Sequence, residues 1–231
     1  MVKYTDYLPE NSSRNRENIE WVIFYSFNAP DEKSPRVLTV GDSICYQYKE
    51  YLHEIMSDKV NVTSWASSKC VTDVTYLKDL EHILEYNRYD FITFNNGLHY
   101  LTEPTSFSEW EAAYRKTLEY IQAKLPAVPI ALLSCTPVNN PEKNAIVIEL
   151  NKITAKIAAD TGLPLIDLYS EMDKLDRSCW SDEFHFKEDT KKNQAEFLAK
   201  YISAKLEDVI KRHSQNLTQK SSPVGPDGAI A

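Results

Sequence analysis

Short apolar runs and amphipathic segments alternate along most of the chain, and this alternation predicts the fold class. Apolar runs typical of buried strands occur at 36–40, 60–64, 91–94, 129–134 and 163–168. Apolar residues at helical spacing predict helices over 46–56, 74–86, 107–125, 141–161 and 188–212. Strands that alternate with helices are typical of a parallel sheet covered on both faces. The pattern therefore predicts a three-layer α/β/α sandwich with a five-stranded parallel sheet.

The two ends of the chain depart from this alternation. Residues 1–34 are polar and irregular around one apolar patch at 19–27, and we interpret them as an N-terminal arm that packs on the domain. The alternating region, 35–213, contains no repeat and no linker, which indicates one domain. From Ser214 onward, Ser, Pro and Gly are frequent and apolar residues are few, which predicts a disordered tail over 214–231.

Composition and charge argue against several classes of partner. The net charge of −8 over 231 residues disfavours a nucleic-acid partner, because phosphate binding requires a basic surface. No apolar run approaches the roughly 20 residues of a membrane span, so we expect no stable membrane insertion. The first residues lack the apolar core of a signal peptide, which favours the cytoplasm; a secreted protein without its signal is the alternative. The spacing of the four cysteines matches no zinc pattern, and we expect neither a metal nor a cofactor.

A serine follows the first predicted strand, in the stretch Gly41-Asp42-Ser43-Ile44. Chemistry in a parallel sheet belongs at the carboxyl ends of the strands. A hydroxyl at the start of the next helix lies where backbone N–H groups favour developing negative charge, which suits a nucleophile. An N-cap role alone is the simpler interpretation of Asp-Ser before a helix.

A candidate base lies before the last predicted helix, in the stretch Asp182-Glu183-Phe184-His185. A serine nucleophile needs a base, and a histidine base needs an acceptor that orients it. Asp182 and His185 are three residues apart, so one turn can hold the carboxylate against one ring nitrogen while the other faces Ser43. A surface histidine beside acidic residues is the alternative interpretation.

These two blocks resemble the first and last blocks of the SGNH (GDSL-type) hydrolase family. The order of strands and helices also fits, and the resemblance covers about 36–212. It implies a flavodoxin-like topology, with Ser43 as the nucleophile, His185 as general base and acid, and Asp182 as the residue that orients His185. An oxyanion hole completes such a site, with the Ser43 N–H as one donor.

The two middle blocks depart from the family pattern. The second block lacks the glycine whose N–H enters the oxyanion hole, and Ser68 or its neighbour Lys69 is expected to donate instead. In the third block, Gly97 falls on the family glycine and His99 on the family asparagine. We expect Asn95 and His99 at the oxyanion hole, with Asn96 as the alternative. A plain turn is the competing interpretation of Asn96-Gly97.

The resemblance implies a carboxylic ester hydrolase, and the substrate is then a small-molecule or glycan ester. Aromatic residues expected near the rim suggest stacking on sugar rings, so an acetylated carbohydrate is favoured: Tyr46, Tyr48, Trp65, Tyr100 and Trp180. A role in the core is the other interpretation of these rings. A thioesterase, lysophospholipase or acyltransferase with the same three residues is an alternative, as is a non-catalytic binding module. The oligomeric state stays open.

Overall fold

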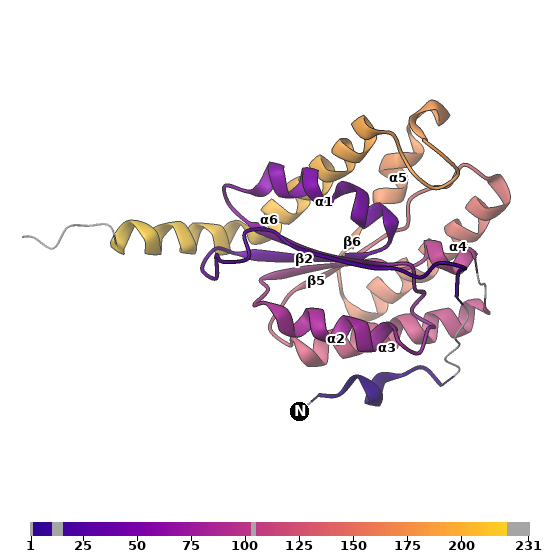
Figure 1. Ribbon diagram of the computed structural model, residues 1–231, viewed down its shortest axis with the longest axis horizontal. Coiled ribbons are helices and arrows are strands. Elements are labelled where there is room, and N and C mark those ends of the chain that lie inside the picture. The colour runs from indigo at the N-terminus through magenta and orange to yellow at the C-terminus, as the bar shows by residue number, and fades with distance from the viewer. Residues whose placement is uncertain (1, 11–15, 103–104, 221–231) are drawn as a thin grey trace, which may run out of the picture.

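The computed structural model describes residues 2–10, 16–102 and 105–220. A sheet lies at the centre, and Figure 1 views it nearly edge-on with α1, α5 and α6 over one face and α2, α3 and α4 over the other. The strands are β1 (Val22–Ser26), β2 (Arg36–Gly41), β3 (Asn61–Ser67), β4 (Phe91–Phe94), β5 (Ile130–Leu133) and β6 (Leu165–Ile166). The helices are α1 (Ser43–Met56), α2 (Tyr76–Tyr86), α3 (Phe107–Lys124), α4 (Pro141–Thr161), α5 (Leu168–Asp173) and α6 (Glu188–Lys220). Three short 3-10 helices lie in the described part of the chain: η1 (Tyr4–Tyr7), η2 (Leu98–Leu101) and η3 (Arg177–Cys179).

The sheet has the order β1-β3-β2-β4-β5-β6, and its last five strands run parallel. Successive side chains of a strand point to opposite faces. Val37 of β2 therefore joins the core beneath α1 and α6, whereas Leu38 joins the core beneath α2 and α3. Both side chains are completely buried, which explains why these strands are continuous apolar runs. The predicted three-layer sandwich is confirmed.

The predicted number of strands is wrong by one, because the N-terminal arm contributes the edge strand β1. This strand pairs antiparallel with β3, from Val22 opposite Ser67 to Ser26 opposite Thr63. Val22 and Tyr25 are exposed, as expected of a strand with one free edge. The greater part of the apolar patch at 19–27 therefore forms a strand of the sheet, Val22–Ser26.

The C-terminal helix is longer than predicted. It was expected to end at 212, but α6 continues to Lys220, and its far end runs past the sheet (Figure 1). The prediction of disorder is therefore wrong for 214–220, and 221–231 lie outside the described residues. The physical reason is that Gly and Pro, which end helices, first occur after Lys220.

Candidate active site

Ser43 is the first residue of α1, directly after β2. The Asp42 side chain caps the helix by accepting a hydrogen bond from the Ile44 N–H at 3.0 Å. A Cβ atom on Gly41 would lie 2.6 Å from the Cβ of Cys45, so the turn from strand to helix requires glycine. The Ser43 hydroxyl consequently lies at a helix N-terminus, where backbone N–H groups have no partner within the helix.

His185 and Asp182 lie in the segment between η3 and α6, and a small hairpin holds them. The Ser181 N–H donates to the His185 carbonyl at 2.8 Å, and Trp180 pairs with Phe186 across the hairpin. The rings of Trp180 and Phe186 pack 4.6 Å apart, with both side chains buried. This apolar base fixes the loop against the domain and leaves His185 and Asp182 at the surface.

The structure brings Ser43, His185 and Asp182 into one hydrogen-bonded chain. The Nε2 atom of His185 lies 2.8 Å from the Ser43 Oγ, and its Nδ1 atom lies 2.9 Å from the Asp182 Oδ2. Ser43 and His185 are 142 residues apart in sequence. The second oxygen of Asp182 accepts the backbone N–H groups of Phe184 and His185, each at 2.8 Å. The Asp182 carboxylate therefore orients the ring and shapes the turn that carries it.

The charge state of Asp182 follows from these contacts. Partial burial acts to raise its pKa, but the N–H groups of Phe184 and His185 and the His185 ring outweigh it, and the net pKa is lowered. The carboxylate is thus ionised at neutral pH and accepts the proton on Nδ1 of His185. The remaining ring nitrogen is then free to accept the Ser43 proton.

A cavity of about 220 Å³ opens beside Ser43 and His185. Its other lining residues are Glu17, Trp21, Leu98, His99, Thr102 and Phe184. Three of these, Trp21, Leu98 and Phe184, give it apolar walls. Glu17 and Trp21 belong to the N-terminal arm, and sequence reasoning missed both. The apolar patch at 19–27, which includes Trp21 and follows Glu17, indicated contact with the domain, but nothing in the sequence placed these two side chains at Ser43.

The second block does not supply the donor that was predicted. The Ser68 N–H donates to the Trp21 carbonyl at 3.1 Å, and the Ser68 hydroxyl contacts Glu20 at 2.6 Å. The alternative donor, the Lys69 N–H, is bound to the Ser67 hydroxyl at 3.1 Å. Both groups are therefore occupied: the arm residue Trp21 binds the Ser68 N–H, and Ser67 of β3 binds the Lys69 N–H.

The asparagines of the third block are also turned away from the cavity. The amide nitrogen of Asn95 donates to the Leu133 carbonyl at 2.7 Å, which ties β4 to β5. The Asn96 side chain binds the Lys69 carbonyl and the Val71 N–H, which holds the loop after β3. Neither asparagine lines the cavity, whereas His99 does. Of the predicted third-block residues, His99 alone reaches the site.

The aromatic residues expected at the rim are mostly core residues. Four of the five are buried: Tyr48, Trp65, Tyr100 and Trp180. Tyr46 is exposed, but the Lys49 ammonium covers its ring at 3.9 Å. The predicted sugar-stacking rim is wrong in these positions, since each of the four rings packs in one of the two cores. Trp21 and Phe184, both half-buried, are the rings beside Ser43.

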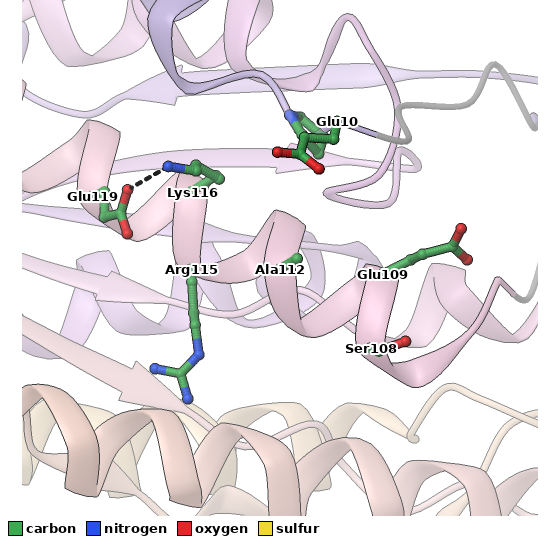
Figure 2. A pocket seen from close by; sticks show the side chains of 8 residues that line it. Glu10, Ser108, Glu109, Ala112, Arg115, Lys116 and Glu119 are labelled. Carbon is green, nitrogen blue, oxygen red and sulfur yellow. Dashed lines mark hydrogen bonds and ion pairs between the residues drawn. The ribbon is translucent and has the colours of Figure 1, made fainter.

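Another hollow, of about 440 Å³, lies along the outer face of α3 (Figure 2). Three of its charged side chains are engaged in ion pairs: Lys116 pairs with Glu119, and Arg115 pairs with Asp160 of α4. In Figure 2, Arg115 points away from Glu10 on the arm. This hollow contains no nucleophile paired with a base, so it does not compete with the cavity at Ser43.

The described residues also bear on two other classes of site. No cluster of three or more His, Cys, Asp or Glu side chains with the geometry of a metal site occurs among them. In the same part of the chain, every helix is too short or too polar to cross a membrane.

Comparison with known proteins identifies a family for most of the chain. The family model of GDSL-like lipases/acylhydrolases matches residues 37–198. No curated protein matches the chain. The N-terminal arm, including Glu17 and Trp21, lies outside the matched range.

Solved structures of low sequence identity share the fold. The lipase/acylhydrolase from Enterococcus faecalis is 17% identical, with a TM-score of 0.58, over 74% of this chain and 96% of that one. A member of the lipolytic G-D-S-L family from Veillonella parvula is 17% identical, with a TM-score of 0.58, over 75% and 98%. A variant of an acetyl xylan esterase from Geobacillus stearothermophilus is 15% identical, with a TM-score of 0.55, over 74% and 93%.

Proposed function

The chain belongs to the GDSL-like lipase/acylhydrolase family and is a carboxylic ester hydrolase, and on this premise we propose that Ser43, His185 and Asp182 form its catalytic triad. The observation that carries the proposal is the continuous hydrogen-bonded chain from Ser43 Oγ through His185 to Asp182. We propose further that the enzyme removes short acyl groups, acetyl above all, from a carbohydrate.

The reaction follows from the positions of these atoms. His185 Nε2 takes the proton of Ser43, and Oγ bonds to the ester carbonyl carbon, whose oxygen becomes an oxyanion. When this intermediate collapses, the bond to the alcohol breaks and His185 gives its proton to the leaving oxygen. A water molecule then attacks the acyl-enzyme, again losing its proton to His185, and Ser43 recovers a proton as the acid leaves. Asp182 keeps the imidazole oriented and stabilises its charged form in both halves.

The size of the cavity supports a short acyl group. Pockets that hold drug-sized ligands have volumes of roughly 300–1,000 Å³, and the cavity beside Ser43 is smaller, at about 220 Å³. Trp21, Leu98 and Phe184 offer an apolar wall to a methyl or ethyl group. A long lipid chain would extend beyond this space, which argues against the lysophospholipase alternative.

The exposure of the base supports hydrolysis over acyl transfer. The side chain of His185 is 28% exposed and that of Asp182 is 54% exposed, so the base is open to water. A transferase gains by excluding water from its acyl-enzyme.

The carbohydrate assignment is supported by the Trp21 and Phe184 rings beside Ser43 and by the shared fold with an acetyl xylan esterase.

Hydrolysis of p-nitrophenyl acetate tests the triad. We expect Ser43→Ala to lower kcat by about 10⁴-fold or more, since the nucleophile is lost. Ser108→Ala, an exposed serine on α3, is the matched control and should retain wild-type turnover. A fluorophosphonate should label the wild-type protein and the control but not Ser43→Ala. Persistent turnover by Ser43→Ala would contradict the triad.

The substrate is tested by a second experiment. The rate of acetate release from acetylated xylo-oligosaccharides is compared with the rate of hydrolysis of esters with longer acyl chains.

A further inference from the structure

The groups expected to donate hydrogen bonds to the oxyanion, in the second and third blocks of the sequence, are not available to it. The N–H groups of Ser68 and Lys69 and the amides of Asn95 and Asn96 are all bound to other protein atoms. The Ser43 N–H at the start of α1 remains. A tetrahedral intermediate is normally stabilised by two or more donors, so a further donor must come from another residue that lines the cavity.

His99 is the candidate for that donor, because it lines the cavity and one of its ring nitrogens has no partner among the described residues. Its Nδ1 atom lies 2.5 Å from the Oε1 atom of Glu17, which also accepts the Thr102 hydroxyl at 2.9 Å. Its Nε2 atom is buried and has no hydrogen-bond partner among the described residues. His99 lines the same cavity as Ser43 and His185. One ring nitrogen is therefore held by the arm, while the other is available to a bound molecule.

We propose that Glu17, from the N-terminal arm, is a positioning residue that holds His99 as an imidazolium whose Nε2–H donates to the oxyanion. This inference rests on the proposed serine mechanism and adds a second histidine–carboxylate pair to it. The two pairs play opposite parts: His185 must be neutral to accept the Ser43 proton, and His99 must be charged to donate. An imidazolium donates from both nitrogens, whereas a neutral ring bound to Glu17 through Nδ1–H presents only a lone pair at Nε2.

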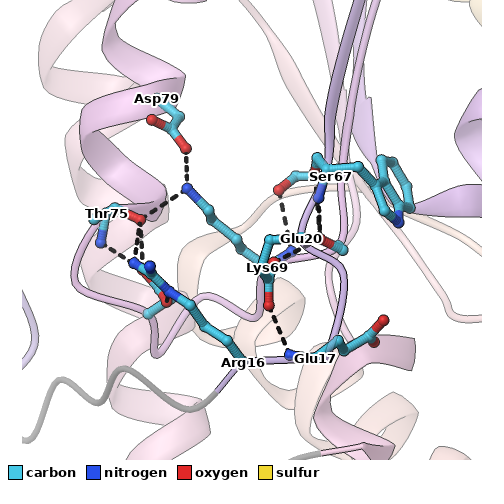
Figure 3. A network of polar contacts seen from close by, with 10 residues as sticks. Arg16, Glu17, Glu20, Ser67, Lys69, Thr75 and Asp79 are labelled. Atoms are coloured by element: carbon cyan, nitrogen blue, oxygen red, sulfur yellow. Dashed lines mark hydrogen bonds and ion pairs between the residues drawn. The ribbon is translucent and has the colours of Figure 1, made fainter.

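The arm is fixed firmly enough to place this carboxylate. Arg16 pairs with Asp73 at 2.9 Å, and Glu20 accepts the Glu17 N–H at 2.8 Å and the Ser68 hydroxyl at 2.6 Å. In Figure 3 the Glu17 carboxylate points away from Arg16 and Lys69. Glu17 is thus held by its neighbours through the backbone, and its charge is directed to His99.

The charged and titratable groups around His99 agree with this assignment. The pKa of Glu17 is lowered, chiefly by its hydrogen bond with His99, against the opposing effect of burial. The cavity at Ser43 adds His185, and a smaller adjoining cavity adds Glu20 and Cys70. Burial raises the pKa of the Cys70 thiol, which stays neutral. Of these groups, the Glu17 carboxylate is the one in contact with the His99 ring, and it compensates the cation that forms there.

The pH dependence of kcat tests the role of Glu17. An imidazolium donor requires kcat to fall on the basic side of its optimum, where the donor is lost. Glu17→Gln keeps a carbonyl acceptor for Nδ1–H but removes the charge, so the basic limb should move to lower pH by about one unit or more. On the basic side of the optimum, kcat should fall about tenfold to a hundredfold. Glu10→Gln is the matched control, because Glu10 is an exposed carboxylate of the same arm that lines the hollow at α3, and the basic limb of this variant should stay where the wild type has it.

A second substitution, His99→Asn, tests the same inference independently. An asparagine amide donates at every pH, so this variant should keep part of the activity and lose the basic limb. In the His99→Asn background, Glu17→Gln should change kcat less than twofold, since its effect passes through the imidazole. His99→Ala should lower kcat by about 10²–10³-fold, as expected for the loss of one oxyanion donor.

NMR of the wild-type protein tests the charge state of His99 without requiring that any variant folds. The nitrogen chemical shifts of the His99 imidazole should show both nitrogens protonated at the pH of maximal kcat. A neutral His99 at that pH, or a Glu17→Gln enzyme with the wild-type pH profile, would overturn the inference. Failure of this inference can be told apart from failure of the triad. If only the role of Glu17 and His99 is wrong, Ser43→Ala stays inactive and a fluorophosphonate still labels the wild-type protein.

Discussion

Substituting Asp182 by asparagine tests the orientation of the base with little change in shape. The amide side chain of Asp182→Asn would keep an oxygen for the N–H groups of Phe184 and His185, which now donate at 2.8 Å, so the turn should survive. Its NH₂ group would then face Nδ1 of His185, where the carboxylate oxygen now lies at 2.9 Å. An amide donor favours the tautomer with the proton on Nε2, and that tautomer donates to Ser43 instead of accepting from it.

The size of the effect depends on how far Asp182 is shielded from water. In a serine protease with a buried aspartate, the same substitution costs about 10⁴-fold in kcat. Here the Asp182 side chain is 54% exposed, so water can replace part of its interaction with His185. We therefore expect a smaller loss, about 10²–10³-fold in kcat, or about 3–4 kcal/mol of transition-state stabilisation. Because the pKa of Asp182 is lowered, the wild-type carboxylate is ionised throughout the neutral range, so the substitution removes a full charge from the neighbour of His185.

Steady-state hydrolysis of p-nitrophenyl acetate measures this loss. Glu183→Gln is the matched control, because its carboxylate pairs with Lys143 at 2.9 Å and not with His185. It should stay within about twofold of the wild type, as exposed pairs contribute little. Circular dichroism and thermal unfolding should show that Asp182→Asn is folded. A folded Asp182→Asn enzyme within threefold of wild-type kcat would refute the reasoning about the tautomer.

Two further predictions concern specificity and stability. Trp21→Ala removes one apolar wall of the cavity, so kcat/KM for p-nitrophenyl butyrate relative to acetate should rise about tenfold, as expected when room for added methylenes opens. An unchanged ratio would remove Trp21 from the acyl-binding wall. Leu198→Ala on α6 empties a fully buried position in the core beneath α1, and should lower the free energy of unfolding in urea by about 2–5 kcal/mol. Leu198→Met preserves volume and should cost less than about 1.5 kcal/mol; equal losses for both would show that this core is not close-packed.

The sequence by itself determined the layers and the two ends of the site. Alternating apolar runs and amphipathic segments require a parallel sheet with helices on both faces, since strands buried on both sides carry apolar residues continuously. Such a sheet brings the ends of its strands to one edge. Ser43 after β2 and His185 before α6 therefore meet although 142 residues separate them. This part of the site depends on the local hydrophobic pattern and on the topology, and both can be predicted from the sequence.

The tertiary structure alone decided which polar groups are available at the site. Asn95 donates to Leu133, 38 residues away, and Ser68 is engaged by Trp21, 47 residues away, whereas His99 meets Glu17 across 82 residues. A side chain or N–H group has few hydrogen-bonding positions, and the partner that fills them is selected by proximity in three dimensions. Residue type shows what a group can donate or accept, but only the packed chain shows whether another atom has already taken that capacity.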